Sequence, residues 1–153
     1  MIRQAELRDL SRIAEILVFS KRVNFRRIFQ DDQYSFGELQ VLSAAEEYAA
    51  DSQALAQTWV YEEDFVKGLI RIQGREGKTL YTDPFFTGQG IGGKLLTFAI
   101  DRFDVRYLWA LEKNEKALAF YGRHGFFPNG VWQYEEGTVE RLLLLERQTI
   151  MEG

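Results

Sequence analysis

The chain has 153 residues and a formal net charge of −4. This length favours one domain, and the charge argues against nucleic acid as a partner, because binding the phosphate backbone needs a basic face. The sequence has no cysteine and one histidine, which excludes disulfides, a cysteine nucleophile and a metal site. It contains neither an apolar run that could span a membrane nor the pattern of a signal peptide, so we expect a soluble cytoplasmic protein with no membrane partner.

The N-terminal residues are predicted to form a strand and a long helix. Residues 2–5 form the strand, and Asp9 is a suitable N-cap for a helix whose apolar positions repeat at helical spacing to about Ser20. Residues 21–29 are basic and aromatic, and they either continue this helix or bend it. The cations of that segment are Lys21, Arg22, Arg26 and Arg27, which we interpret as a solvated helix face.

The next predicted elements are a helix and three strands. Ser35 and Glu38 have the spacing of a capping box at the start of the helix. The hydrophobic period then changes from helical to alternating, which predicts strands at residues 58–62, 65–73 and 78–82. A glycine-containing turn separates the last two strands, so the three strands are expected to form an antiparallel meander.

The C-terminal half is predicted to alternate helices and strands. The sequence Gly-Gln-Gly-Ile-Gly-Gly at residues 88–93 opens a helix, and a strand follows at residues 106–111. Asn114 caps another helix, and residues 131–134 and 139–146 form a final hairpin. This order predicts an α+β fold with a mixed, mostly antiparallel sheet of six to seven strands, flanked by about four helices.

The glycine-rich segment at residues 88–93 is the most informative motif. Glycines at this density mark backbone that turns sharply or approaches a ligand closely. A glycine loop that opens a helix presents unpaired N–H groups at the positive end of the helix dipole, where a diphosphate binds. Gly88, Gly90 and Gly93 also satisfy the dinucleotide-binding pattern, with Glu112 about twenty residues further on.

A dinucleotide-binding fold is nevertheless disfavoured by the context of the motif. Residues 83–87 separate the preceding strand from the first glycine, and the strands before the loop are antiparallel hairpins. Too few strand–helix units remain after the loop to build a doubly wound sheet. A nucleoside-triphosphate P-loop is disfavoured too, because no Lys-Ser or Lys-Thr pair follows the glycines.

Two segments together resemble the GNAT superfamily of acyl-CoA N-acetyltransferases. Residues 80–92 resemble its strand and pyrophosphate loop, and residues 111–126 resemble its second cofactor motif, in which Asn114 and Tyr121 stand seven residues apart. The resemblance covers essentially the whole chain and implies a single GNAT-like domain at residues 1–153. One departure is Thr87, which stands where the family usually has Arg or Gln.

The resemblance implies roles for individual residues. Tyr121 is expected to be the general acid that protonates the departing CoA thiolate, although its spacing also fits an ordinary buried aromatic. Glu62 and Asp83 are candidate general bases, and each also fits a structural or solvated role. His124, at a helix end, is interpreted as a partner of the helix dipole rather than a base. The residues implied to bind the cofactor are Leu80, Tyr81, Thr82, Gly88, Gln89, Gly90, Ile91, Gly92, Gly93, Asn114 and Tyr121.

The function implied is transfer of an acetyl group from acetyl-CoA to a primary amine by direct attack in a ternary complex. The resemblance also implies a homodimer. The alternative function is a non-catalytic acyl-CoA sensor or interaction module of the same fold. The acceptor amine is not identified. Its pocket is expected between the first two helices and the final hairpin, with candidate walls at Phe25, Phe29, Tyr34, Trp59, Trp132 and Tyr134.

Overall fold

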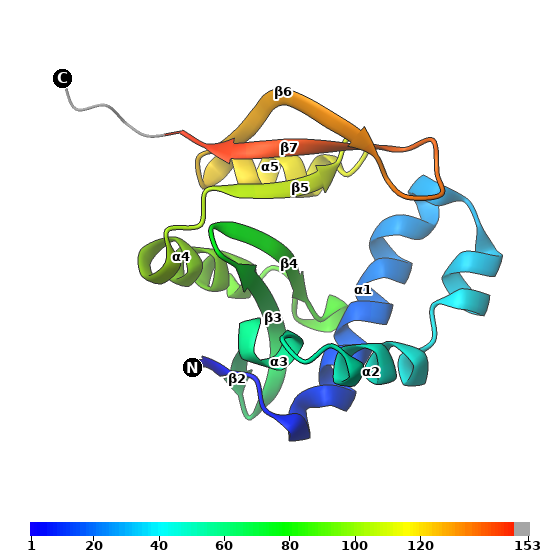
Figure 1. The fold of residues 1–153 in the computed structure, drawn as a ribbon, viewed down its shortest axis with the longest axis vertical. Helices are drawn as coiled ribbons and strands as arrows, with labels where there is room; N and C mark the ends of the chain where they lie inside the picture. Colours follow the sequence, from blue (N-terminus) through cyan, green and yellow to red (C-terminus); the bar gives the residue numbers. More distant parts are fainter. Residues whose placement is uncertain (149–153) are drawn as a thin grey trace.

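The structure is a computed structural model that describes residues 1–148 (Figure 1). Its centre is a seven-stranded sheet in the order β1-β2-β3-β4-β5-β7-β6, which confirms the predicted mixed α+β sheet. The last five residues of the predicted domain lie outside the described part. Among the described residues, none of the helices is long and apolar enough to cross a membrane.

All neighbouring strands in the sheet are antiparallel except β4 and β5, which run parallel. This arrangement is unlike the parallel, doubly wound sheet that a dinucleotide-binding fold requires. The final hairpin is confirmed, but its first strand begins earlier than predicted and is interrupted by a bulge. The strands are β1 (Ile2–Gln4), β2 (Thr58–Glu63), β3 (Phe65–Gln73), β4 (Glu76–Thr82), β5 (Tyr107–Leu111), β6 (Phe126–Tyr134) and β7 (Arg141–Arg147).

Four helices of nine or more residues flank the sheet, as predicted, together with one short helix that the sequence pattern did not indicate. The first helix continues through its basic and aromatic half as one twenty-residue element. The helices are α1 (Leu10–Phe29), α2 (Val41–Ala50), α3 (Ala54–Gln57), α4 (Ile91–Phe103) and α5 (Glu115–Arg123). Single 3-10 turns occupy Leu7–Asp9 and Pro84–Phe86.

Of the two caps predicted in the N-terminal region, one is confirmed in position only and the other is wrong. Asp9 is the N-cap residue of α1, but its side chain does not cap that helix; its Oδ2 accepts from the backbone N–H of Glu6 at 2.8 Å, within the preceding 3-10 turn. Ser35 does not open a helix either, because it lies inside a π-helical turn at Gln33–Glu38 and α2 begins later. The Ser35 hydroxyl is buried and has no hydrogen-bond partner among the described residues.

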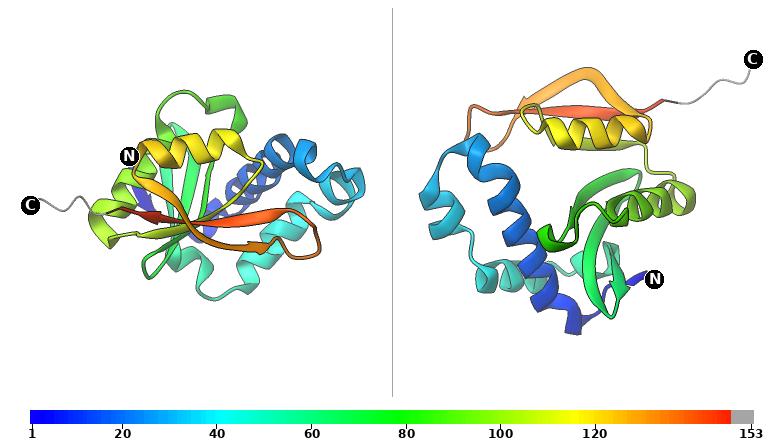
Figure 2. Two further views of the ribbon diagram at one scale, coloured as in Figure 1. Left: turned by 90° about the horizontal axis from the view of Figure 1, so that it is seen from above. Right: turned by 180° about the vertical axis from the view of Figure 1, so that it is seen from behind.

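Side-chain alternation along the central strands divides the core into two layers. Leu69 of β3 packs with α1, whereas its neighbour Ile70 packs with α4 on the other face of the sheet. Likewise Tyr81 of β4 lies on the α1 side and Leu80 on the α4 side. Helices α1 and α2 therefore lie on one face of the sheet, and α4 and α5 on the other (Figures 1 and 2).

Strands β4 and β5 pair only at their beginnings. The paired positions are Glu76 with Tyr107 and Gly77 with Leu108, after which the strands diverge (Figure 1). The divergence starts at a bulge, because Lys78 is an extra residue between two consecutive β3 partners. The rest of β4 therefore has an edge that no described strand of the sheet occupies, although it lies in the middle of the sheet.

Candidate active site

A cavity of about 1260 Å³ passes through the opening between β4 and β5. Its walls come from both faces of the sheet, namely α1 and α2 on one side and α4 and α5 on the other. The predicted site residues Leu80, Tyr81 and Thr82 line it from β4. Of the predicted loop, Gly88, Gly90, Ile91, Gly92 and Gly93 line it as well. The strand and the loop of the first cofactor motif therefore line the same cavity.

The glycine loop has the backbone conformation that its composition predicts. Gly88 and Gly90 have φ values of 82° and 79°, in the left-handed region where an L side chain is strained. Gly90 is the N-cap of α4, and its carbonyl accepts the first intrahelical hydrogen bond from Lys94 at 3.0 Å. The N–H groups of the first turn of α4 therefore have no intrahelical acceptor and lie at the cavity wall, together with the positive end of the helix dipole.

Asn114 and Tyr121 line the cavity from the start and the end of α5. The Asn114 Oδ1 accepts from the backbone N–H of Ala117 at 3.3 Å, which confirms the predicted cap and leaves the amide NH₂ as a donor. The Tyr121 ring packs against Phe120 and Phe126, at centroid distances of 5.3 and 6.5 Å. Desolvation raises the pKa of Tyr121 to about 12, so its hydroxyl is protonated at neutral pH.

The two candidate bases named from the sequence have structural partners and do not line the cavity. Glu62 accepts from the Arg3 guanidinium at 3.0 and 3.3 Å, and these bonds lower its pKa. Asp83 is buried; its Oδ2 pairs with Arg12 at 2.6 Å and its Oδ1 accepts from the Phe85 N–H at 2.9 Å. A base role for either carboxylate stays a prediction.

The end of the cavity formed by α1, α2 and the final hairpin is lined by charged and aromatic side chains that the sequence pattern did not place there. Of the predicted aromatic wall, Phe25 and Tyr34 line the cavity and Phe29 does not. Trp59 instead packs with Phe98 and Phe103 in the core, and Trp132 and Tyr134 are exposed outside the cavity. The charged residues near this end are Lys21, Glu38, Glu47 and Glu135, and the ion pair of Asp51 with Arg71.

Glu135 follows β6 and lies where the final hairpin approaches α1 (Figures 1 and 2). Its charge contributes to the raised pKa values of Tyr34 and Tyr81, for which burial is the larger cause. Its side chain makes no ion pair within 4 Å among the described residues. The sequence around Glu135 does not predict that this residue lines the cavity, because its location depends on how far the hairpin extends over the sheet.

His124 is the C-cap of α5, as its position predicts. Its Nδ1 is 3.0 Å from the carbonyl oxygen of Phe120, and its ring lines the cavity next to Gly93. Lys116 and Arg123 of the same helix also line the cavity. His124 thus places a hydrogen-bonding group beside the glycine loop, and Thr87 at the start of that loop has only a short hydroxyl side chain.

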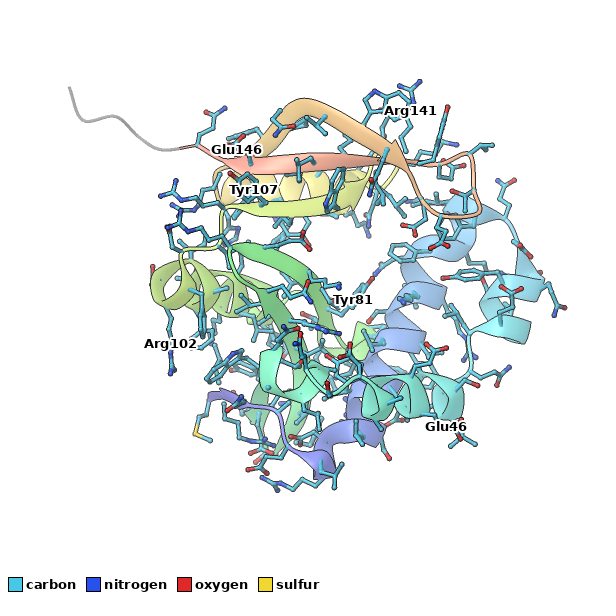
Figure 3. All side chains as sticks on the ribbon, in the orientation of Figure 1. Glu46, Tyr81, Arg102, Tyr107, Arg141 and Glu146 are labelled. Atoms are coloured by element: carbon cyan, nitrogen blue, oxygen red, sulfur yellow. The ribbon has the colours of Figure 1, made fainter. Side chains whose placement is uncertain are left out.

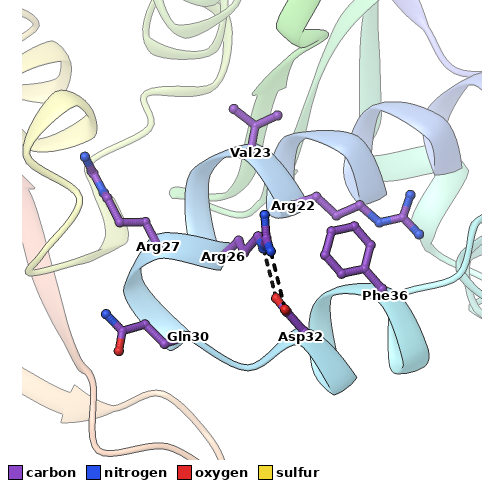
Figure 4. Close-up of a pocket in the computed structure, with 7 residues that line it drawn as sticks. All are labelled: Arg22, Val23, Arg26, Arg27, Gln30, Asp32 and Phe36. Atoms are coloured by element: carbon purple, nitrogen blue, oxygen red, sulfur yellow. Dashed lines mark hydrogen bonds and ion pairs between the residues drawn. The ribbon is translucent and has the colours of Figure 1, made fainter.

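A second, open hollow of about 900 Å³ lies on the outer face of α1 (Figure 4). Two of its arginines are engaged in the local structure. Arg26 pairs with Asp32 at 2.9 Å, and Arg22 donates to the backbone carbonyls of Ser35 and Leu39 at 3.0 and 2.9 Å. We therefore assign this hollow a structural role in joining α1 to the turn that follows it.

The sequence profile of the family described as "Acetyltransferase (GNAT) domain" matches residues 54–128, which include β4, the glycine loop and α5. Residues 54–128 belong to the GNAT superfamily. The chain is 34% identical over 85 residues to the peptidyl-lysine N-acetyltransferase YiaC of Escherichia coli strain K12. That match covers 54% of the chain and 58% of YiaC, so the chain matches little more than half of the length of this curated relative.

Solved structures show the same GNAT fold over nearly the whole chain. The apo form of YjaB from Escherichia coli superposes with a TM-score of 0.77 at 22% identity, covering 96% of both chains. The PaiA N-acetyltransferase of Thermoplasma acidophilum, solved in complex with coenzyme A, superposes with a TM-score of 0.70 at 18% identity, covering 97% of this chain and 98% of that one. The GNAT resemblance predicted from the sequence is confirmed.

Proposed function

We propose that this GNAT protein transfers an acetyl group from acetyl-CoA to a primary amine, by direct attack in a ternary complex. The observation that carries the proposal is the single cavity that joins the glycine loop, the free edge of β4 and Tyr121. The coenzyme A complex of the fold neighbour PaiA supports the choice of cofactor. The absence of cysteine from the sequence removes the usual carrier of a two-step route through an acyl-enzyme.

The cofactor is assigned to the cavity by the chemistry of its parts. The diphosphate would accept hydrogen bonds from the backbone N–H groups of residues 88–93 at the start of α4. The pantetheine arm would pair with the free edge of β4 at Leu80, Tyr81 and Thr82, as an added strand does. The free amide NH₂ of Asn114 would donate to the same arm. Gln89, between the lining residues Gly88 and Gly90, does not itself line the cavity, and its cofactor contact stays a prediction.

The reaction then follows from the groups around the thioester. The amine nitrogen attacks the carbonyl carbon, and a backbone N–H near Thr82 stabilises the oxyanion, by about 3 kcal/mol if it resembles other preorganised donors. When the C–S bond breaks, Tyr121 donates its proton to the sulfur. The raised pKa of Tyr121 keeps that proton in place until the thiolate, a stronger base than water, develops beside it.

The acceptor end of the cavity favours a cationic amine. Glu38, Glu47 and Glu135 contribute three negative charges there, and Lys21 contributes one positive charge. A lysine side chain is one acceptor of this kind, and it is the acceptor named for the relative YiaC. We assign deprotonation of the amine to the cavity-lining carboxylate of Glu135, with Glu62 or Asp83, acting through water, as the alternatives.

The experiment that tests the proposal compares Tyr121→Phe with the control Tyr107→Phe, whose residue lies on β5 outside the cavity. Thiol release from acetyl-CoA is measured with a panel of amines, and acetyl-CoA binding is measured by calorimetry. We expect Tyr121→Phe to lower kcat about 100-fold with little change in cofactor affinity, because only the hydroxyl is lost. The control should retain its activity.

Three results would change this conclusion. If thiol release by Tyr121→Phe equals that of the wild type, Tyr121 is not the acid. If the wild type binds acetyl-CoA but acetylates no amine in a broad panel, the non-catalytic sensor function is supported instead. If calorimetry shows no heat with coenzyme A, the cofactor assignment and the function that depends on it are wrong.

A further inference from the structure

Lys21 faces the cavity, although its basic neighbours in the sequence do not. Leu17, Lys21 and Phe25 follow each other at four-residue spacing on α1, so they form one stripe along the helix, and all three line the cavity. Arg22 and Arg26 line the outer hollow on the other side of the same helix (Figure 4). The prediction of a solvated face is therefore wrong for Lys21, which is partly buried.

Two contacts fix this part of α1 against β4, one on each side of Lys21. The Ser20 hydroxyl donates to the carbonyl oxygen of Thr82 at 3.2 Å. One turn further along the helix, the Phe25 ring packs on the Tyr81 ring at a centroid distance of 6.4 Å. The Tyr81 side chain lies between β4 and α1 (Figure 3). Lys21 therefore starts opposite the two β4 residues assigned to the thioester end of the cofactor, and its flexible four-carbon stem extends from there into the cavity.

The Lys21 ammonium is not held by any near partner. Within residues 1–148 it makes no hydrogen bond and no ion pair within 4 Å. By contrast, Arg22 donates to two backbone carbonyls and Arg26 forms an ion pair with Asp32. Burial lowers the pKa of Lys21, and the charges of Glu135 and Glu47 partly oppose this shift. A lysine in this situation has a larger fraction of the neutral, nucleophilic amine than a solvated one.

We propose that Lys21 is itself an acyl acceptor, acetylated by the acetyl-CoA bound in the same chain. This inference rests on the proposed function, because it uses the same cofactor and the same cavity. The neutral Nζ attacks the thioester carbonyl carbon, the C–S bond breaks, and the thiolate takes a proton from Tyr121. The nitrogen releases one proton to Glu135 or to water, and the products are N-acetyl-Lys21 and free coenzyme A.

The modification would regulate the site. Acetylation removes the positive charge of Lys21 and adds an acetyl group at the acceptor end of the cavity. Glu47 and Glu135 then lose an opposing charge, and the space for an external amine becomes smaller. A saturating external amine should therefore protect Lys21, and the acetylated chain should transfer acetyl groups to that amine more slowly.

The test incubates the full chain with acetyl-CoA in the absence of an amine and follows intact mass and peptide maps with time. We expect one acetyl group on Lys21, added with a first-order rate that does not depend on protein concentration. Lys116 is the internal control, because it lines the same cavity from α5 on the cofactor side. Labelling of Lys21 should be at least about tenfold faster than that of Lys116, since only Lys21 is positioned for the reaction.

Lys21→Arg should lose the fast labelling while its thermal unfolding shows a folded chain, and urea-unfolded wild type should label its lysines without preference. If Lys21 stays unmodified although acetyl-CoA binds and external amines are acetylated, this inference is overturned and the proposed function stands. Equal labelling of Lys21 and Lys116, or a rate that rises with protein concentration, also overturns it. If acetyl-CoA gives no heat of binding, the proposed function fails as well.

Discussion

Replacing Gly90 by alanine tests whether the glycine loop needs a residue without a Cβ atom at its left-handed position. Gly90 has φ +79°, and a Cβ built on it has no heavy atom within 4 Å. Space is therefore not limiting, and the expected cost is the left-handed conformation alone, about 1–2 kcal/mol. We expect the free energy of unfolding to fall by this amount, which lowers the melting temperature by about 2–4 °C for each kcal/mol in a chain of this size.

Gly93→Ala is the matched control in the same loop and helix. Gly93 lies inside α4 without a positive φ, and a Cβ there has its nearest neighbour at 3.5 Å, at the His124 ring, which is ordinary contact. Because alanine is favoured over glycine in a helix by up to about 1 kcal/mol, this variant should be as stable as the wild type or more stable. The free energy of unfolding of Gly90→Ala should therefore be about 2 kcal/mol lower than that of Gly93→Ala.

The assays are urea unfolding without ligand and calorimetric titration with coenzyme A. If Gly90→Ala relieves its strain by rotating φ, the N–H groups at the start of α4 turn away from the diphosphate, and affinity should fall roughly tenfold for the loss of one charge-assisted hydrogen bond. Equal stability of Gly90→Ala and Gly93→Ala would refute the steric explanation. Unchanged coenzyme A affinity in a destabilised Gly90→Ala would show that the loop keeps its conformation under strain.

Three further substitutions and conditions have defined outcomes. Asp83→Asn should destabilise the fold by about 3 kcal/mol, because it leaves the charge of Arg12 without its buried partner, and its pH–rate profile should keep the wild-type shape; loss of the acid-side limb, along which activity rises as a base loses its proton, would instead identify Asp83 as the catalytic base. The hydrogen bonds from Arg3 lower the pKa of Asp9, so its stabilising contribution is present above the ordinary carboxyl pKa and is lost as the pH falls through the folded value. In urea unfolding, Asp9→Asn should therefore lose less stability than the wild type between pH 7 and pH 3. An identical loss in the two proteins would contradict this assignment. Thr87→Arg should tighten coenzyme A binding about fivefold in calorimetry, because it adds a cation beside the loop at an exposed position. An unchanged affinity would show that the diphosphate lies beyond the reach of a side chain at position 87.

The order of elements and the two cofactor motifs could be predicted from the amino-acid sequence. Local chemistry was sufficient at the glycine loop and at Asn114, because a positive φ and an N-cap each depend on a few consecutive residues. It failed for Asp9 and Ser35, which have suitable cap side chains but find other surroundings in the fold. A favourable local interaction is replaced when a tertiary contact or a different turn places the side chain elsewhere.

The set of side chains that share the cavity could not be predicted from the sequence, because it depends on tertiary packing. Glu62 and Asp83 are near β4 in the sequence, yet arginines from β1 and α1 hold both in ion pairs. Lys21 and Glu135 are 114 positions apart in number and come together because β4 and β5 diverge and the last hairpin approaches α1. The hydrophobic periodicity of a sequence predicts which face of a helix or strand a residue lies on. It does not predict which other element packs against that face, because here this depends on how the strands of the sheet separate.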